Sequence, residues 1–241
     1  DWLDVREAAR LSLRLEGPFA KALEGAADNL VLRAARELDV WAEEHGHRVM
    51  PVEITLEKNL PVAAGIGGGS SDAAATLLML AEFWSLPIAI DEIQAIALSL
   101  GADVPVCVRG QPTVVTGLGE ILTPVDNLPP FSLVLANPGV EVPTAQIFKG
   151  LQARSGDELP PLSPPPETAR ELAMMLDRTT NDLAPIAKAI APSIGRVEAA
   201  IASTDGCLIA RMSGSGATCF GLYETDSQAA AAAAAIARAH P

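Results

Sequence analysis

The chain of 241 residues has a hydrophobic fraction of 49% and an aromatic fraction of 4%, so its core must consist mainly of Ala, Leu, Val and Ile. Its formal net charge of −13 argues against nucleic acid or an anionic membrane as a partner. No apolar run reaches the roughly 18 residues of a membrane-spanning helix, and no secretory signal opens the chain. We therefore expect a cytoplasmic protein, as a monomer or a homodimer.

The first elements alternate between strands and helices. Leu11–Leu15 and Val52–Leu56 alternate apolar and polar residues, which is the period of half-buried strands. Between them, Asn29 precedes an apolar stripe at helical spacing over Leu30–Trp41, which Gly46 ends. The residues before Leu11 show no strand start.

Two helices follow a glycine-rich loop at Pro61–Ser71, the glycine loop below. Ser70 or Ser71 is expected to cap the first helix, which ends before Pro87. A second helix opens at Asp91 and stops at Gly101, after which a turn leads into an apolar strand ending at Val108.

The second half also mixes strands and helices, with a domain division near Asp126 and an exposed Pro- and Ser-rich loop at Arg154–Glu167. Strands are expected at Thr113–Thr116, Phe131–Ala136, Cys207–Met212 and Thr218–Tyr223, and helices at Glu167–Leu176, Ala187–Ser203 and the Ala-rich C-terminal segment. This mixture predicts an α+β fold.

The cysteines and histidines do not suggest a metal site. Cys107, Cys207 and Cys219 lack Cys-x-x-Cys spacing and are expected to be reduced, buried side chains. His45 and His47 flank a helix end, where solvated side chains are a simpler interpretation than metal ligands.

The stretch Pro61–Ala75 holds four glycines in five residues and then two serines. A P-loop is excluded because no lysine follows the glycines. A dinucleotide-binding turn would need a second strand ending in an acid about 20 residues further on, but Pro87 and another helix occupy that position. Two interpretations stay open, a tight structural turn and a phosphate cradle of backbone amides at a helix N-terminus.

Residues Pro61-x-x-x-Gly65-Ile66-Gly67 and Ser70-Ser71-Asp72-Ala73 resemble the second motif of the galactose, homoserine, mevalonate and phosphomevalonate kinases. The additional Gly68 and Gly69 resemble one branch, which phosphorylates a small-molecule cytidyl diphosphate sugar alcohol in the non-mevalonate route to isoprenoids. Further stretches resemble that branch in matching order: Asp28–Ala35, Lys58–Pro61, Gly101–Gly110, Gly119–Leu122, Asn137–Gly139, Pro143–Phe148, Asn181–Leu183 and Ser213–Ala217.

The resemblance implies a two-domain small-molecule kinase fold that uses ATP and Mg²⁺. Residues 1–126 would form a ribosomal-S5-like ATP-binding domain, and residues 127–241 a ferredoxin-like α+β domain. Members of the branch begin with a Pro-x-Lys-x-Asn-Leu strand and a Gly-Tyr-His segment, so we expect about 35 residues, including the first strand, to be missing before Asp1.

Site roles follow from the same resemblance. Asp103 would activate or orient the acceptor hydroxyl, Phe148 would stack on the cytosine, and Thr144 would lie in the substrate pocket. Asn29 and Lys58 would lie at the adenine. The ATP phosphates would contact Pro61, Val62, Ala63, Ala64, Gly65, Ile66, Gly67, Gly68, Gly69, Ser70 and Ser71.

Each role has a plainer alternative at this point. Asp103 could be a turn or cap residue, Asn29 and one of the serines could be simple N-caps, and Phe148 could belong to the core. Gly214 and Gly216 could make only a tight hairpin, which the resemblance places behind the phosphate site. For the whole chain, a homoserine or mevalonate kinase, a non-catalytic nucleotide-binding fragment and a dinucleotide-binding protein remain alternatives.

Overall fold

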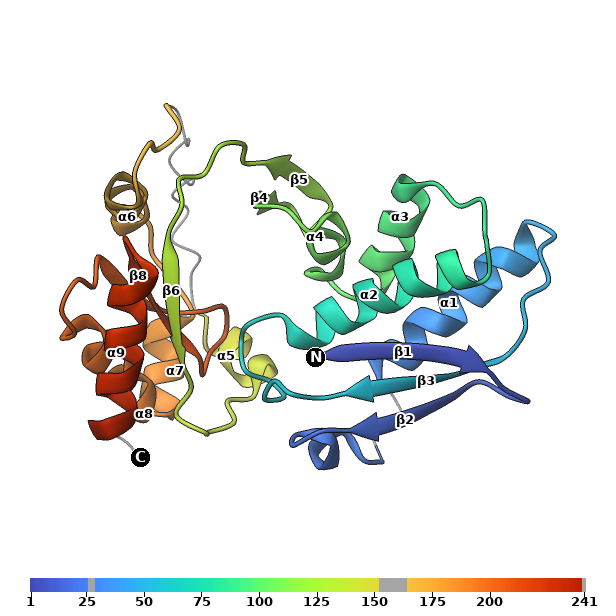
Figure 1. Ribbon diagram of the computed structural model, residues 1–241, viewed down its shortest axis with the longest axis horizontal. Helices are drawn as coiled ribbons and strands as arrows, with labels where there is room; N and C mark the ends of the chain where they lie inside the picture. The colour runs from blue at the N-terminus through green and yellow to red at the C-terminus, as the bar shows by residue number, and fades with distance from the viewer. Residues whose placement is uncertain (26–28, 152–163, 240–241) are drawn as a thin grey trace. The chain divides into compact units, whose positions relative to one another are not determined.

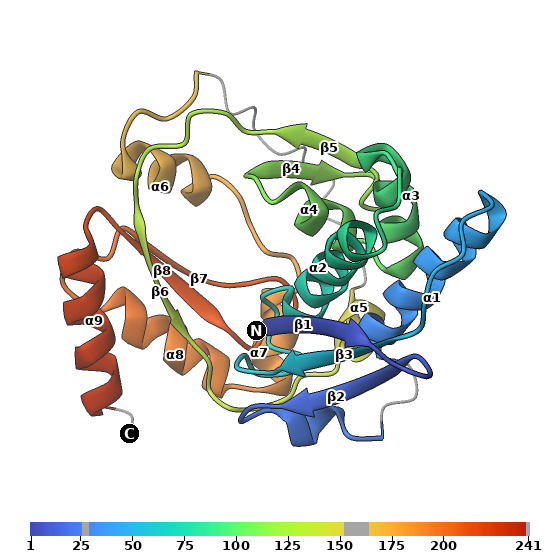
Figure 2. The ribbon, with the colours of Figure 1, turned by 45° about the vertical axis from the view of Figure 1, so that its right-hand side comes forward.

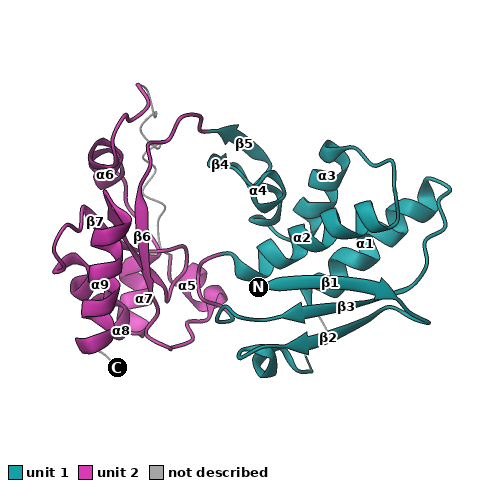
Figure 3. Cartoon of the chain, viewed as in Figure 1, with its two compact units in different colours: residues 1–62, 67–124 teal, residues 63–66, 125–241 magenta. Residues whose placement is uncertain are grey.

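The computed structural model describes residues 1–25, 29–151 and 164–239. The chain separates into two compact units (Figure 3). Unit 1 contains Asp1–Val62 and Gly67–Pro124, and unit 2 contains Ala63–Ile66 and Val125–Pro241. Both units mix helices and strands, which confirms the α+β prediction.

Unit 1 is built on a three-stranded sheet with the order β1-β3-β2 (Figure 1). The central strand β3 runs antiparallel to β1 and parallel to β2. The elements of this unit are β1 (Trp2–Glu7), β2 (Ser12–Glu16), a 3-10 helix (Ala20–Leu23), α1 (Leu30–Glu44), β3 (Val52–Glu57), α2 (Gly68–Phe83), α3 (Ile90–Leu100), α4 (Val104–Arg109), β4 (Thr113–Thr116) and β5 (Ile121–Pro124). Strands β4 and β5 form a separate antiparallel pair.

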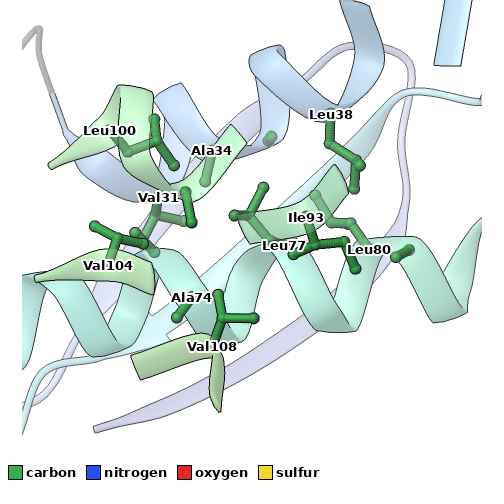
Figure 4. Packing of buried hydrophobic residues seen from close by; sticks show 14 of the residues in the cluster. Val31, Ala34, Leu38, Ala74, Leu77, Leu80, Ile93, Leu100, Val104 and Val108 are labelled. Atoms are coloured by element: carbon green, nitrogen blue, oxygen red, sulfur yellow. The ribbon is translucent and has the colours of Figure 1, made fainter. Parts of the chain in front are cut away.

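The core of unit 1 lies between this sheet and helices α1 to α4. Figure 4 shows Val31 and Leu38 of α1 facing Leu77 and Leu80 of α2. On β3, every second side chain is buried, as the alternation of Val52–Leu56 predicts. Small residues such as Ala34 and Ala74 let the helices approach closely in this core of few aromatics.

Unit 2 contains an antiparallel sheet with the order β6-β8-β7 (Figure 2). Its elements are β6 (Ser132–Ala136), α5 (Thr144–Gly150), α6 (Ala169–Asp177), α7 (Ala184–Ile190), α8 (Ser193–Ala202), β7 (Ile209–Met212), β8 (Cys219–Tyr223) and α9 (Asp226–Ala239). Leu222 packs with α6 and the adjacent Tyr223 with α9, so helices cover both faces of the sheet.

Three sequence predictions about helices were wrong. The apolar run after Asp103 is helix α4 and not a strand, since a short apolar run has no decisive period and Pro105 fits a first helical turn. Helix α2 begins at Gly68, so neither serine caps it. The expected single helix Ala187–Ser203 is α7 and α8, because Pro192 interrupts the pattern.

Other differences concern elements that the sequence patterns did not mark. Strand β1 occupies Trp2–Glu7, where no strand start was expected, and β5 and α5 were not predicted. The expected loop Arg154–Glu167 lies mostly outside the described residues. Among the residues described, no helix has both the length and the apolar character needed to cross a bilayer.

The cysteines are all free thiols. Cys219 is buried, as expected, and burial raises its pKa to about 11, whereas Cys107 and Cys207 are half-buried. His45 stacks on Trp41 with ring centroids 4.1 Å apart, and its Nδ1 lies 2.7 Å from the Trp41 carbonyl oxygen. These side chains are therefore part of the end of α1.

Candidate active site

The N-terminus of α2 has the properties of an anion site. Gly67 occupies the N-cap position with φ of 70°, a left-handed conformation that glycine adopts at little cost. It offers no side chain to the first-turn amides, which have no acceptor within the helix itself. Ser71 donates its backbone N–H to the Gly67 carbonyl oxygen at 2.8 Å. The helix therefore presents amides and the positive end of its dipole at Gly68–Ser70.

A buried ionic cluster lies at the same helix end. The Lys58 ammonium donates to Asp72 Oδ2 at 2.9 Å and to Asp1 Oδ2 at 2.5 Å. The exposed fractions of these three side chains are 3% for Lys58, 8% for Asp72 and 4% for Asp1. Lys58 was expected at the adenine, but its ammonium is held by two carboxylates. No local sequence pattern predicts this cluster, because Lys58 is 14 residues from Asp72 and 57 residues from Asp1 along the chain.

Asn29 is the N-cap of α1, as its simpler interpretation held. Its Oδ1 accepts the backbone N–H of Val31 at 2.9 Å, and the residue is only 7% exposed. A Cβ atom added to Gly69 would lie 3.6 Å from Leu30 Cδ1. The beginnings of α1 and α2 therefore lie close together, which brings Asn29 into the neighbourhood of the glycine loop.

Asp103 is exposed at the N-cap position of α4 and makes no side-chain cap hydrogen bond. Helix α4 packs against α2, with Val104 and Val108 over that helix (Figure 4). Gly119 has φ of 115°, and a Cβ there would lie 2.2 Å from the Ala102 carbonyl oxygen. The β4–β5 turn therefore fits directly against the residue that precedes Asp103.

The Asp103 carboxylate also acts on a neighbouring thiol. Burial raises the pKa of Cys107, and the charge of Asp103 raises it further. Because Asp103 is exposed, its carboxylate is open to a ligand. The backbone on either side of it is held, since Ala102 contacts the β4–β5 turn and helix α4 packs against α2.

The first half of the glycine loop contacts the β7–β8 turn within unit 2. Gly65 has φ of 72°, and a Cβ on it would lie 2.5 Å from the Gly216 carbonyl oxygen. Ser213 Oγ donates to the Gly65 carbonyl oxygen at 2.8 Å, and the Thr218 N–H donates to the Ala64 carbonyl oxygen at 3.1 Å. The glycine-rich hairpin turn is therefore a support for residues Ala64 and Gly65, in addition to being a hairpin.

Two asparagines support that turn. Asn181 Nδ2 donates to the carbonyl oxygens of Met212 and Gly214, at 3.1 and 2.8 Å. Asn137 Nδ2 donates to Thr218 Oγ1 at 2.9 Å. Both asparagines belong to stretches that resemble the kinase branch, but no role was expected for either of them.

Helix α5 carries two of the three candidate substrate residues, Thr144 and Phe148. Thr144 Oγ1 lies 3.1 Å from Ser215 Oγ in the glycine turn. Phe148 is 56% exposed, whereas its neighbour Ile147 is fully buried. Phe148 therefore does not belong to the core, and its ring is free to meet a planar ligand.

The candidate residues fall into two groups. Unit 1 brings together Lys58, Asn29 and Gly67–Ser71, with Asp103 on the adjoining helix α4. Unit 2 brings together Ala64, Gly65 and Thr144 around the β7–β8 turn, with Phe148 one turn along α5. In the described part of the chain, no group of three or more His, Cys, Asp or Glu side chains could hold a metal ion.

Two family models match the chain. The GHMP kinases N-terminal domain matches residues 29–111, and the GHMP kinases C-terminal domain matches residues 165–241. The first match includes the glycine loop and Asp103, and the second includes the β7–β8 turn.

Curated relatives match over the full length of the chain. A 4-diphosphocytidyl-2-C-methyl-D-erythritol kinase of Cereibacter sphaeroides (strain KD131) is 51% identical over 242 residues, covering 100% of this chain and 83% of its own. The protein of the same name from Parvibaculum lavamentivorans is 49% identical, covering 100% of this chain and 82% of its own.

Solved structures agree in fold. A crystal structure of 4-(cytidine 5'-diphospho)-2C-methyl-D-erythritol kinase has a TM-score of 0.71 and 31% identity, covering 98% of this chain and 81% of that one. A homoserine kinase from Cytophaga hutchinsonii also has a TM-score of 0.71, at 18% identity, covering 98% of this chain and 80% of that one. At that identity the second likeness concerns the fold alone.

Proposed function

Because the chain belongs to the GHMP kinase family, we infer that it is an ATP-dependent phosphotransferase and that its acceptor is 4-diphosphocytidyl-2-C-methyl-D-erythritol. The observation that carries the substrate assignment is the 51% identity, over the whole chain, to a relative named for that substrate. The homoserine kinase likeness falls to 18% identity, which favours this substrate over the sister kinases. The reaction belongs to the formation of isoprenoid precursors, and its substrate is a small molecule.

We propose that the glycine loop holds the ATP phosphates. The glycine N-cap of α2 supports this assignment, since it leaves the first-turn amides directed at an anion. Our proposal includes all of Pro61–Ser71, together with Asn29 at the adenine, where its helix begins beside Gly69. ATP supplies the phosphoryl group, and magnesium would be held mainly by the phosphates, because Mg²⁺ keeps few protein ligands.

Asp103 is proposed to act on the acceptor hydroxyl. Its carboxylate is exposed and makes no cap hydrogen bond, so an oxygen is available to a substrate proton. The hydroxyl oxygen forms a bond to the γ-phosphorus as the bond to ADP breaks, and the hydroxyl proton passes to Asp103. This is the role of a general base, and phosphoryl transfer otherwise depends on positioning and electrostatics.

The remaining assignments are also proposals. We assign residues 1–126 to the ATP-binding domain and 127–241 to the C-terminal domain, and the division of the chain after Pro124 supports that boundary. We further propose that the enzyme works in the cytoplasm as a monomer or a homodimer.

A substrate panel tests the function. With ATP and a coupled assay for ADP, we expect turnover of 4-diphosphocytidyl-2-C-methyl-D-erythritol and none above background of homoserine or mevalonate. The assay should use the complete protein, since the curated relatives extend beyond the part that this chain matches. Turnover of homoserine or mevalonate without the cytidyl substrate would refute the assignment.

Phe148→Ala tests the nucleobase contact. Because the ring is 56% exposed, we expect an unchanged melting temperature, an unchanged KM for ATP and a KM for the cytidyl substrate that rises about tenfold, as for loss of one base–aromatic stack. Steady-state kinetics with each substrate varied measures these values.

The neighbouring Ile147→Ala is the matched control. Its side chain is fully buried, so it should lower the melting temperature through a cavity instead. An unchanged KM for the cytidyl substrate in Phe148→Ala would remove Phe148 from the site.

A further inference from the structure

The second turn of α2 begins with a negative charge that the anion-binding function does not need. Asp72 is the fifth residue of α2, and its side chain is 8% exposed. A carboxylate in the first helical turns occupies the same positive field that would attract a phosphate. Buried charges are also costly unless they are paired. Asp72 therefore requires a partner if this helix end is to bind a highly charged anion.

Lys58 is that partner, and its ammonium lies next to Gly68, the first residue of the helix. A Cβ on Gly68 would lie 3.4 Å from the Lys58 ammonium and 3.8 Å from Asp1 Oδ2. The ammonium therefore lies beside the start of α2, within ordinary contact distance of that position. From there it reaches Asp72 at 2.9 Å.

The same lysine is tied to the strand that leads into the loop. Asp1 accepts the Lys58 ammonium with one oxygen, and with the other it accepts the backbone N–H groups of Asn59 and Leu60, at 2.7 and 2.9 Å. The Lys58 backbone N–H donates to the Glu16 carbonyl oxygen at 2.7 Å. The cluster therefore connects β2, the segment after β3 and the start of α2.

We propose that Lys58 is a positioning residue, which neutralises Asp72 and holds the start of α2 so that its amides can receive the triphosphate. This inference rests on the proposed function of the glycine loop. It differs from a contact between the Lys58 ammonium and the adenine, because both carboxylates already hold that ammonium.

Two ligands separate the two roles of Lys58. If Lys58 acts through Asp72, loss of the Lys58 ammonium should weaken the binding of a ligand more strongly the more phosphate charge the ligand carries. If it contacts the base, its loss should weaken ATP and adenosine equally. Calorimetry with ATP and with adenosine, at one salt concentration, measures both affinities.

Four proteins form the test: wild type, Lys58→Met, Asp72→Asn and the double variant. We expect Lys58→Met to raise the Kd of ATP about tenfold or more, with the Kd of adenosine unchanged. Asp72→Asn alone should bind ATP at least as tightly as wild type. The double variant should bind ATP within about threefold of Asp72→Asn, because the uncompensated carboxylate is gone. In kinetics, the KM for ATP should rise in Lys58→Met while kcat stays near the wild-type value.

If Lys58→Met does not fold, the role of Lys58 can still be measured, because the double variant and Asp72→Asn differ only at Lys58. Equal losses for ATP and adenosine in the double variant would overturn the proposal in favour of a base contact, and so would a lack of rescue by Asp72→Asn. Lys21→Met, at an exposed position of unit 1, is the control and should bind both ligands normally. A wild-type protein that binds no ATP would refute the proposed function itself, which is a distinguishable result.

Discussion

Asp103→Asn is expected to lower kcat by about two to four orders of magnitude while the Kd of ATP changes little. The substitution removes the group that we propose to accept the proton of the acceptor hydroxyl. It should not disturb the fold, because Asp103 is exposed at the N-cap of α4, where Asn is as good a residue as Asp. Single-turnover kinetics and calorimetry with ATP measure the two quantities separately.

Asp91→Asn is the matched control for charge. Asp91 lies exposed in the first turn of α3, and its loss should leave kcat unchanged. The assignment of Asp103 would be wrong if Asp103→Asn retained wild-type turnover in the complete protein.

Cys107 reports whether the substitution has kept the local structure. Because the Asp103 charge raises the pKa of the Cys107 thiol in addition to burial, Asp103→Asn should lower that pKa. The pH dependence of alkylation at Cys107 should therefore move to lower pH, with Cys207 replaced by Ser to remove the other half-buried thiol. Unfolding of α4 would also lower this pKa by exposing the thiol, so the shift must be accompanied by an unchanged melting temperature; lost turnover together with both results would place the defect in the carboxylate and not in a misfolded α4.

Local patterns predicted the elements whose signals lie within a few residues. The alternation of β3 and the apolar stripe of α1 with its Asn29 cap are set by periodicity and by one side-chain hydrogen bond. The strand β8 was expected from its apolar run, and the helix α9 from the helix propensity of its alanines. Such signals need no knowledge of the rest of the molecule.

The errors occurred where local signals compete. The run Val104–Val108 is too short for its period to distinguish a strand from a helix, and its packing against α2 decides the outcome. At the glycine loop, two serines looked like caps, but Gly67 in a left-handed conformation ends the loop three residues earlier. The sequence therefore left Asp103 open as a turn or cap residue, and the structure places it at the N-cap of α4.

The resemblance placed the Gly214–Gly216 turn behind the phosphate site, but no local pattern predicted the individual contacts that support the site. Lys58 meets Asp1 across 57 residues, and Gly65 meets Ser213 across 148 residues. Neither contact has a spacing that a single sequence could reveal. The sequence did indicate which glycines matter, and the structure separates those that are needed for packing from those that only face the proposed ligand.

Gly65→Ala is expected to destabilise unit 2 strongly, by about 3 kcal/mol or more, and to weaken ATP binding as a consequence. A Cβ at this position would lie 2.5 and 2.7 Å from the carbonyl oxygens of Gly216 and Ser213, and the φ of 72° disfavours any side chain. Neither obstacle is a flexible side chain, so the backbone of the β7–β8 turn would have to move. For a chain of this size, thermal unfolding should show a melting temperature lower by roughly 6 to 12 °C.

Gly69→Ala separates folding from ligand binding at the same loop. A Cβ there would meet only Leu30 Cδ1, at an ordinary contact distance of 3.6 Å, and Ala favours a helix by up to about 1 kcal/mol over Gly. The melting temperature should therefore stay the same or rise. If the phosphates approach the first-turn amides of α2, the added methyl group should nevertheless weaken ATP binding. Loss of affinity without loss of stability in Gly69→Ala, against loss of both in Gly65→Ala, would mean that Gly69 is needed for the ligand and Gly65 for the turn. Normal ATP affinity in Gly69→Ala would exclude a phosphate from that end of the helix.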